Sequence, residues 1–239
     1  EKKFTVSGTI TNNSAKRIYL EKVPAATMQP MISDSATIGK DGKFSLEAET
    51  NESVVYNLRL DQNTYPVASV INDAENIKLK IVMSKENSEF AEKYEVEGST
   101  ASQQMKDFMI GFNNDLQKIF VIAQQADSLQ KKGATDSLLF PLMAEQKSVA
   151  EKIKKYSEEA LSKSTDPALT LFELGYYQST ANNSGFGLLP FTNEQVNELV
   201  NQIATKFPSH QGAAAIRASL AQQMQKEATT SWVGKEAPD

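Results

Sequence analysis

The chain has 239 residues, of which 40% are apolar and 23% are charged, so its composition is that of a globular protein and not of a disordered one. No stretch approaches the roughly 20 consecutive apolar residues that a membrane-spanning helix needs. The net charge is −5 and cysteine is absent, so nucleic-acid or anionic-membrane binding is not expected, and thiol chemistry within this chain is excluded.

Residues 4–98 alternate apolar and polar side chains with a period of two, which predicts β-strands. The clearest strand covers residues 54–60, where every second side chain is apolar. The segment from Gly39 to Gly42 is typical of a tight hairpin, and Gly98 ends the last strand. We expect seven or eight short antiparallel strands that form a small sandwich or an open barrel.

Beyond Gly98 the apolar period changes from two to 3.6, which predicts helices. Thr100 and Gln103 are spaced as a capping box, and the first helix is expected to run from there to Gly133. A second helix follows, with Pro141 near its start.

Two apolar stripes on these helices, Met105 to Ala123 and Val149 to Ala160, are expected to be buried. The set of Met105, Met109 and Met143 has the chemistry of a soft metal site. Its helical spacing beside aromatic residues favours core filling instead.

Three further helices are predicted by their caps. Asp166 and Pro167 have the residue types of an N-cap and a first helical position. Thr192 and Gln195 are spaced as a second capping box, and that helix is expected to end near Pro208. Ser209 is expected to cap the last helix.

The order of strands followed by helices predicts an α+β fold. We expect an antiparallel β module over residues 1–98 and a module of about five helices over residues 99–230. Because no Pro/Gly/Ser-rich spacer separates the two modules, we expect them to pack together.

No catalytic residue, metal ligand or cofactor site is predicted. The single histidine, His210, is expected to be a solvated residue in the first turn of the last helix, without the partners that a base or ligand needs. Glu158-Glu159 indicates a solvated helix surface, and Gly185-Phe186-Gly187 lacks the spacing of a phosphate loop. The acidic residues at turns lack calcium-loop spacing and favour turn formation; they are Asp34, Asp41, Asp61 and Asp73.

The best local ligand candidate lies beside the irregular link over residues 182–190. Aromatic and amide side chains in such a place can line a pocket; here they are Tyr176, Tyr177, Asn182, Asn183 and Phe186. Adjacent tyrosines on a helix point to different faces, so at most one of the pair is expected in the core. A client surface is expected here or at an exposed sheet edge.

The last residues of the chain resemble the first residues of a known type of domain. Gly234, Ala237, Pro238 and Asp239 form the pattern Gly-x-x-Ala-Pro-Asp, which is similar to the start of thioredoxin-like and peroxiredoxin-like domains of the TlpA/ResA type. Those domains carry a Cys-x-x-Cys pair further along the chain.

The β-rich part resembles the module known as domain of unknown function 4369. The features that match are the opening from Phe4 to Ile10, Asp34-Ser35 before a strand, the segment from Asp41 to Phe44, and the closing segment from Glu97 to Ser99. In proteins of that kind, the β module and a helical stretch precede a thiol:disulfide oxidoreductase domain.

This resemblance implies that residues 231–239 begin a thioredoxin-like domain and that the chain stops before its Cys-x-x-Cys, so no catalytic cysteine maps onto this sequence. It also implies a periplasmic protein of the Gram-negative envelope. Such proteins are often lipoproteins, which predicts a trimmed leader and a lipid anchor upstream of Glu1.

Three functional hypotheses follow. The first is a non-catalytic N-terminal module of a periplasmic thiol:disulfide oxidoreductase, which positions the missing domain, binds client proteins or forms a homodimer. Its partners would be client thiols and disulfides, reached through that domain. The second is a free-standing binding module of the envelope, with a groove between the sheet and the helices. The third is a hydrolase that uses carboxylates, which no recognisable pair supports.

Overall fold

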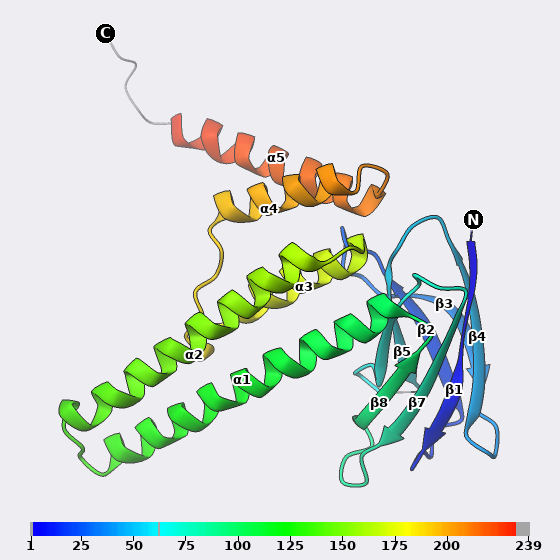
Figure 1. Cartoon of the computed structure of the whole chain (residues 1–239), viewed down its shortest axis with the longest axis horizontal. Helices are drawn as coiled ribbons and strands as arrows, with labels where there is room; N and C mark the ends of the chain where they lie inside the picture. The colour runs from blue at the N-terminus through cyan, green and yellow to red at the C-terminus, as the bar shows by residue number, and fades with distance from the viewer. Residues whose placement is uncertain (1, 62, 233–239) are drawn as a thin grey trace.

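The structure is a computed structural model that describes residues 2–61 and 63–232 (Figure 1). The side chains of residues 184 and 230–232 are not described. The motif from Gly234 to Asp239 therefore lies outside the described residues.

The β module contains eight strands in two four-stranded sheets, with the orders β4-β1-β7-β8 and β3-β2-β5-β6. The strands are β1 (Lys2–Thr11), β2 (Arg17–Val23), β3 (Met31–Thr37), β4 (Lys43–Thr50), β5 (Val55–Leu60), β6 (Ala68–Ile71), β7 (Asn76–Met83) and β8 (Ala91–Glu97). The sheets are not closed into a barrel. The α+β fold is confirmed. In the part of the chain that the structure describes, five of the six strand pairings are antiparallel, as predicted, and the exception is the parallel pairing of β1 with β7.

The inner faces of the two sheets share one hydrophobic core. Alternate residues of β4 and β7 are buried, as the period of two requires. The rings of Phe4 and Tyr56, one from each sheet, meet edge to face with centroids 4.8 Å apart. Each fully buried side chain of this size contributes about 1.5–3 kcal/mol to the free energy of folding.

Five α-helices and one short 3-10 helix follow the sandwich in the described part of the chain. They are α1 (Thr100–Lys131), α2 (Asp136–Lys163), α3 (Pro167–Ala181), η1 (Ser184–Phe186), α4 (Asn193–Lys206) and α5 (Gln211–Trp232). Figure 1 shows α1 and α2 as an antiparallel hairpin whose far end projects away from the sandwich. Among the described residues, no helix is both long enough and apolar enough to cross a membrane.

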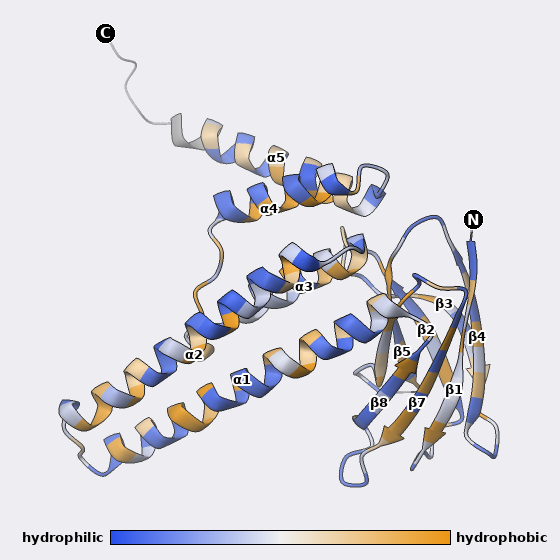
Figure 2. Cartoon of the chain, viewed as in Figure 1, coloured by the Kyte–Doolittle hydropathy of each residue, from blue (hydrophilic) through white to orange (hydrophobic). Residues whose placement is uncertain are grey.

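The far end of the α1–α2 hairpin departs from the expected burial. Phe120 is 42% exposed and Met143 is 60% exposed, although the apolar spacing placed both among core residues. Figure 2 shows further apolar residues at this end. Periodicity identifies an apolar face but not what covers it. Among the described residues, Phe120 meets the ring of Phe186 from η1, yet both Phe120 and Met143 stay partly open to solvent.

The junction between the modules is tightly bonded. The hydroxyl of Ser99 accepts a hydrogen bond from the backbone N–H of Ser102 at 3.0 Å, so Ser99 is the N-cap of α1. The hydroxyl of Ser102 accepts from the N–H of Ile71 at 2.8 Å, which ties the helix start to β6. The predicted capping box of Thr100 and Gln103 is therefore wrong, because contacts with the preceding strands move the cap back by one residue.

The two modules also share buried apolar contacts. Ile71 of β6 packs with Ala101 and Met105 of α1 and with Ala168 and Leu169 of α3. The modules are thus in direct contact, as the absence of a spacer predicted.

The starts of α3 and α4 follow the sequence signals closely. Asp166 caps α3 ahead of Pro167, and Thr192 forms a complete capping box with Gln195 at α4. The helix α2 begins at Asp136, so Pro141 lies near its start, as predicted.

Candidate functional site: the cleft between the sandwich and the helices

A cleft of about 500 Å³ lies between the outer face of the β3-β2-β5-β6 sheet and the helices α3, α4 and α5. Its volume falls within the range of roughly 300–1,000 Å³ that is typical of small-molecule sites. The apolar side chains that line it come from both modules and include Val23, Val55, Leu171, Phe172, Val196, Val200, Ile216 and Leu220.

The loop between β4 and β5 fixes the helical wall of the cleft. The carboxylate of Glu52 accepts from the backbone N–H of Gln211 at 2.6 Å and of Gly212 at 3.4 Å, at the start of α5. A negative charge at a helix N-terminus is favourable, because the unpaired N–H groups there carry partial positive charge.

The same loop holds the start of α3. The hydroxyl of Ser53 lies 2.9 and 2.8 Å from the two carboxylate oxygens of Asp166, to which it donates. Asp166 in turn caps α3 by accepting from the N–H of Leu169 at 2.9 Å. One loop of the sandwich therefore sets the positions of two helix starts.

His210 completes this anchor at the bottom of the cleft. Its Nδ1 accepts from the backbone N–H of Ala213 at 3.0 Å, and its Nε2 lies 2.7 Å from the carbonyl oxygen of Ser53. A nitrogen that accepts carries no proton, so these contacts assign the neutral tautomer with the proton on Nε2.

The prediction that His210 is solvated is therefore wrong. Its side chain is only 5% exposed, and it takes the capping position expected of Ser209. Sequence spacing could not show this, because the covering residues Glu52 and Ser53 lie more than 150 positions earlier in the chain. Nothing in the local sequence marks that pair as functional.

The polar side chains around the cleft are already hydrogen-bonded within the protein. The hydroxyl of Tyr176 donates to Oδ1 of Asn113 at 2.9 Å. Gln178 both donates to and accepts from the backbone of Phe191, at 2.8 and 2.9 Å. The cleft therefore offers shape and apolar surface, and the bonds of these groups would have to break before they could serve a ligand.

At Gly175, no side chain covers the backbone of α3 where it borders the cleft. A Cβ placed on this residue would meet no atom within 4 Å, so the backbone of α3 borders open space there. The glycine is conformationally unnecessary inside a helix, where it costs about 1 kcal/mol relative to alanine.

The five predicted site residues do not gather in one pocket, and only Tyr176 lines the cleft. Tyr177 is fully buried, its hydroxyl donates to the carbonyl of Leu189 at 2.6 Å, and burial raises its pKa to about 12. The adjacent tyrosines thus divide between core and cleft, in line with the helical argument.

The other three members of the set lie at or beyond the end of α3. Asn182 is the C-cap of α3, and Asn183 caps η1 by accepting from the N–H of Gly185 at 3.1 Å. Phe186 meets Phe120 edge to face with ring centroids 5.1 Å apart. These residues shape the link and do not line the cleft.

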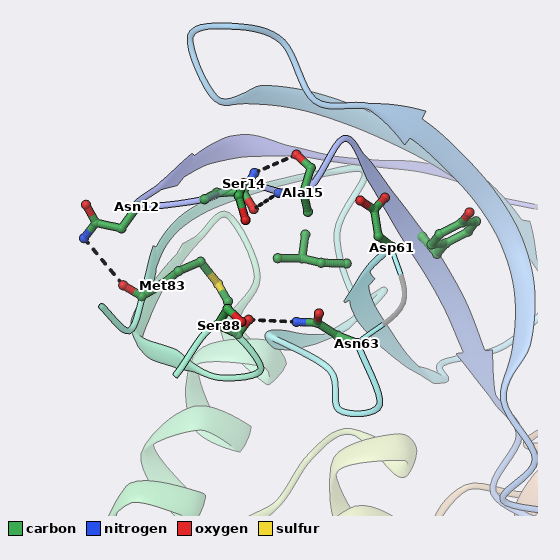
Figure 3. A pocket seen from close by; sticks show the side chains of 10 residues that line it. Asn12, Ser14, Ala15, Asp61, Asn63, Met83 and Ser88 are labelled. Atoms are coloured by element: carbon green, nitrogen blue, oxygen red, sulfur yellow. Dashed lines mark hydrogen bonds between the residues drawn. The ribbon is translucent and has the colours of Figure 1, made fainter. Parts of the chain in front are cut away.

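A second cavity, of about 380 Å³, lies at one end of the sandwich (Figure 3). The carboxylate of Asp61 accepts from the N–H groups of Lys16 and Arg17 at 2.9 and 2.7 Å, and Asn63 donates to the carbonyl of Ser88 at 3.0 Å. These polar groups hold loops together, so Asp61 acts as a turn residue, as predicted. Within the described residues, no group of three or more His, Cys, Asp or Glu side chains could hold a metal ion.

Comparison with known families supports the interpretation of the β module. Residues 4–105 match the model of a domain of unknown function (DUF4369). A DUF4369 domain therefore occupies this part of the chain. No curated protein shows a significant match to the sequence.

The matched residues run from Phe4 in β1 through β8 to the first residues of α1. The DUF4369 domain supplies one wall of the cleft, through Val23, Val55 and the loop residues Glu52 and Ser53. The opposite wall comes from α3, α4 and α5, which lie outside the matched residues. The cleft is thus a feature of this domain together with its helical partner.

Proposed function

We propose that this chain is a non-catalytic binding module of the Gram-negative cell envelope that holds client proteins close to a thiol:disulfide oxidoreductase domain. The observation that carries the binding part is the apolar cleft between the sandwich and the helices. The redox part rests on the resemblance of residues 4–98 and 234–239 to such proteins. The chain supplies no thiolate of its own, because it contains no cysteine.

The cleft suits apolar side chains of a client that is not fully folded. Such clients expose apolar surface until their core forms. The polar groups at the cleft are bonded internally, so recognition would depend on burial of apolar area and would tolerate many sequences. Holding a client there would raise its effective concentration near the redox centre without any covalent contact.

Substitution of Gly175 tests the cleft. Gly175→Leu would place a side chain in the open space beside α3, whereas Gly175→Ala adds a single methyl group and serves as the matched control. We expect the leucine variant to bind a reduced, carboxymethylated model protein about tenfold more weakly than the wild type, because the added side chain occupies part of the apolar site. Fluorescence titration measures both affinities, and equal binding by the leucine variant and the wild type would contradict the proposal.

A disulfide-reduction assay tests the redox part. The nucleophile in thiol–disulfide exchange is a thiolate, so we expect no turnover from the 239-residue chain and measurable turnover from a longer gene product that contains Cys-x-x-Cys. Turnover by the short chain above the blank would disprove its inert role. Inactivity of a long product with an intact Cys-x-x-Cys would disprove the oxidoreductase assignment.

The second candidate is a free-standing binding module of the envelope. The size of the cleft, which matches a single small apolar ligand, favours it. The gene sequence after Asp239 separates the two candidates, because a thioredoxin-like domain selects the first and a stop codon selects the second. For both candidates we propose a periplasmic location, with a lipid anchor upstream of Glu1, which cell fractionation and metabolic lipid labelling would test.

A further inference from the structure

A third cavity, of about 270 Å³, lies among α1, α2 and α3, and its lining differs from that of the cleft. Carboxylates and aromatic rings dominate it. The residues that line it are Gln104, Asp107, Phe108, Tyr156, Glu159, Ala160, Lys163, Ser164, Leu169 and Glu173.

Glu173 brings a carboxyl group to the inside of this cavity. Its side chain is 3% exposed, and its Oε2 is buried without a hydrogen-bond partner among the described residues. Burial raises its pKa to about 7. Because a buried carboxylate without a partner is costly, buried charges in proteins are normally paired, and this one has no partner in the protein itself.

The walls around Glu173 present aromatic rings. Phe108 and Tyr156 are stacked, with ring centroids 5.5 Å apart and planes within 7° of parallel. The hydroxyl of Tyr156 donates to the carbonyl oxygens of Asp107 and Phe108, each at 3.3 Å, which holds the ring in place.

The exposed rim adds further negative charge. Asp107 and Glu159 lie there together with one basic residue, Lys163, whose Nζ is 3.9 Å from the carboxylate of Glu159. With Glu173 ionised, three carboxylates face one ammonium group, so the cavity is negative overall. An anion would be repelled, and a neutral ligand would leave the buried carboxyl uncompensated.

We propose that this cavity binds the ammonium or guanidinium group of an amine ligand, such as the end of a lysine or arginine side chain. The carboxylate of Glu173 would pair with the cation, and the stacked pair of Phe108 and Tyr156 would form an aromatic wall beside its alkyl stem. The rim carboxylates would attract the cation toward the opening. The site is separate from the apolar cleft, and neither depends on the other.

Calorimetric titration of the whole 239-residue chain with n-butylammonium and n-butylguanidinium at pH 8 tests the proposal. We expect saturable binding that Glu173→Gln weakens by about tenfold or more, because the amide keeps the shape and removes the charge. Glu158→Gln is the matched control, since Glu158 is an exposed residue of α2 that does not line the cavity. It should bind as the wild type does. The neutral analogue 1-butanol should not bind.

Two further titrations, one at lower pH and one with amino-acid amides, test the role of the Glu173 charge and the size of ligand that the cavity admits. Binding should weaken between pH 8 and pH 5 in the wild type, because protonation of Glu173 removes its charge, and it should change less in Glu173→Gln. Lysine and arginine amides acetylated at the α-nitrogen show whether a peptide-borne side chain also enters. Equal affinity of Glu173→Gln and wild type, equal binding of 1-butanol, or no saturation by either cation at millimolar concentration would overturn the proposal.

Discussion

The side chain of Glu173 is only 3% exposed, and this burial raises the pKa of its carboxyl group from 4.5 to about 7. A raised pKa means that the folded protein binds a proton that the unfolded chain has already released between these two pH values. Stability from this group is therefore undiminished below about pH 4.5 and falls as the pH rises to about 7.

We predict that Glu173→Gln removes this loss. Relative to the variant, the wild type should lose up to about 3 kcal/mol of unfolding free energy between pH 4.5 and pH 8, which is the shift of the pKa expressed as energy. Urea denaturation of both proteins at several pH values measures the difference. The exposed Glu158→Gln should show no such trend, and parallel pH profiles of Glu173→Gln and the wild type would contradict the assignment.

At the scale of single elements, α5 depends on an anchor that lies outside it. Its first N–H groups bond to the imidazole of His210 and to the carboxylate of Glu52 from the β4–β5 loop. Residues 221–229 are all exposed, so its second half gains little from packing. The position of this helix is therefore set at its N-terminal end.

We predict that His210→Ala destabilises the protein by about 2 kcal/mol or more, because it removes a cap and leaves a small cavity under α5. His210→Asn, which can still cap, should recover part of this loss. Denaturant unfolding, together with amide hydrogen exchange in the first turn of α5, measures the effect. Ser209→Ala is the control and should be nearly neutral, so a larger effect there than at His210 would refute this account.

At the scale of the whole molecule, the sandwich and the helices behave as one body because their contact is buried and bonded. Ile71 packs against α1 and α3, and the hydroxyl of Ser102 holds the end of β6. The chain turns from strand to helix within a few residues around Gly98, without a linker that would allow the modules to move apart.

We predict a single cooperative unfolding transition for the chain, with circular dichroism and tyrosine fluorescence giving the same midpoint. Limited proteolysis should not cleave the backbone near residue 99 while the modules remain folded, because hydrogen bonds hold the chain there. Early cleavage near residue 99 into two stable, separable fragments would show that the modules are independent.

Features that depend on residues close together in the chain could be predicted from the amino-acid sequence. The period of two and then 3.6 placed the strands and helices, and the caps at Asp166 and Thr192 were predicted because a cap bonds to residues only three positions away. The resemblance of the first part to a DUF4369 domain was likewise readable from short motifs and is confirmed over residues 4–105.

Features that depend on contacts between residues far apart in the chain could be seen only in the folded protein. Asp73, whose carboxylate accepts from the N–H of Ala101 at 2.8 Å, helps fix the start of α1 at Ser99, and no local signal shows this. Contacts between distant segments also bury His210 under Glu52 and Ser53. They likewise form the cleft and the Glu173 cavity. A pattern of apolar residues states which face of an element is buried, but the partner of that face is fixed by packing between segments far apart in the chain.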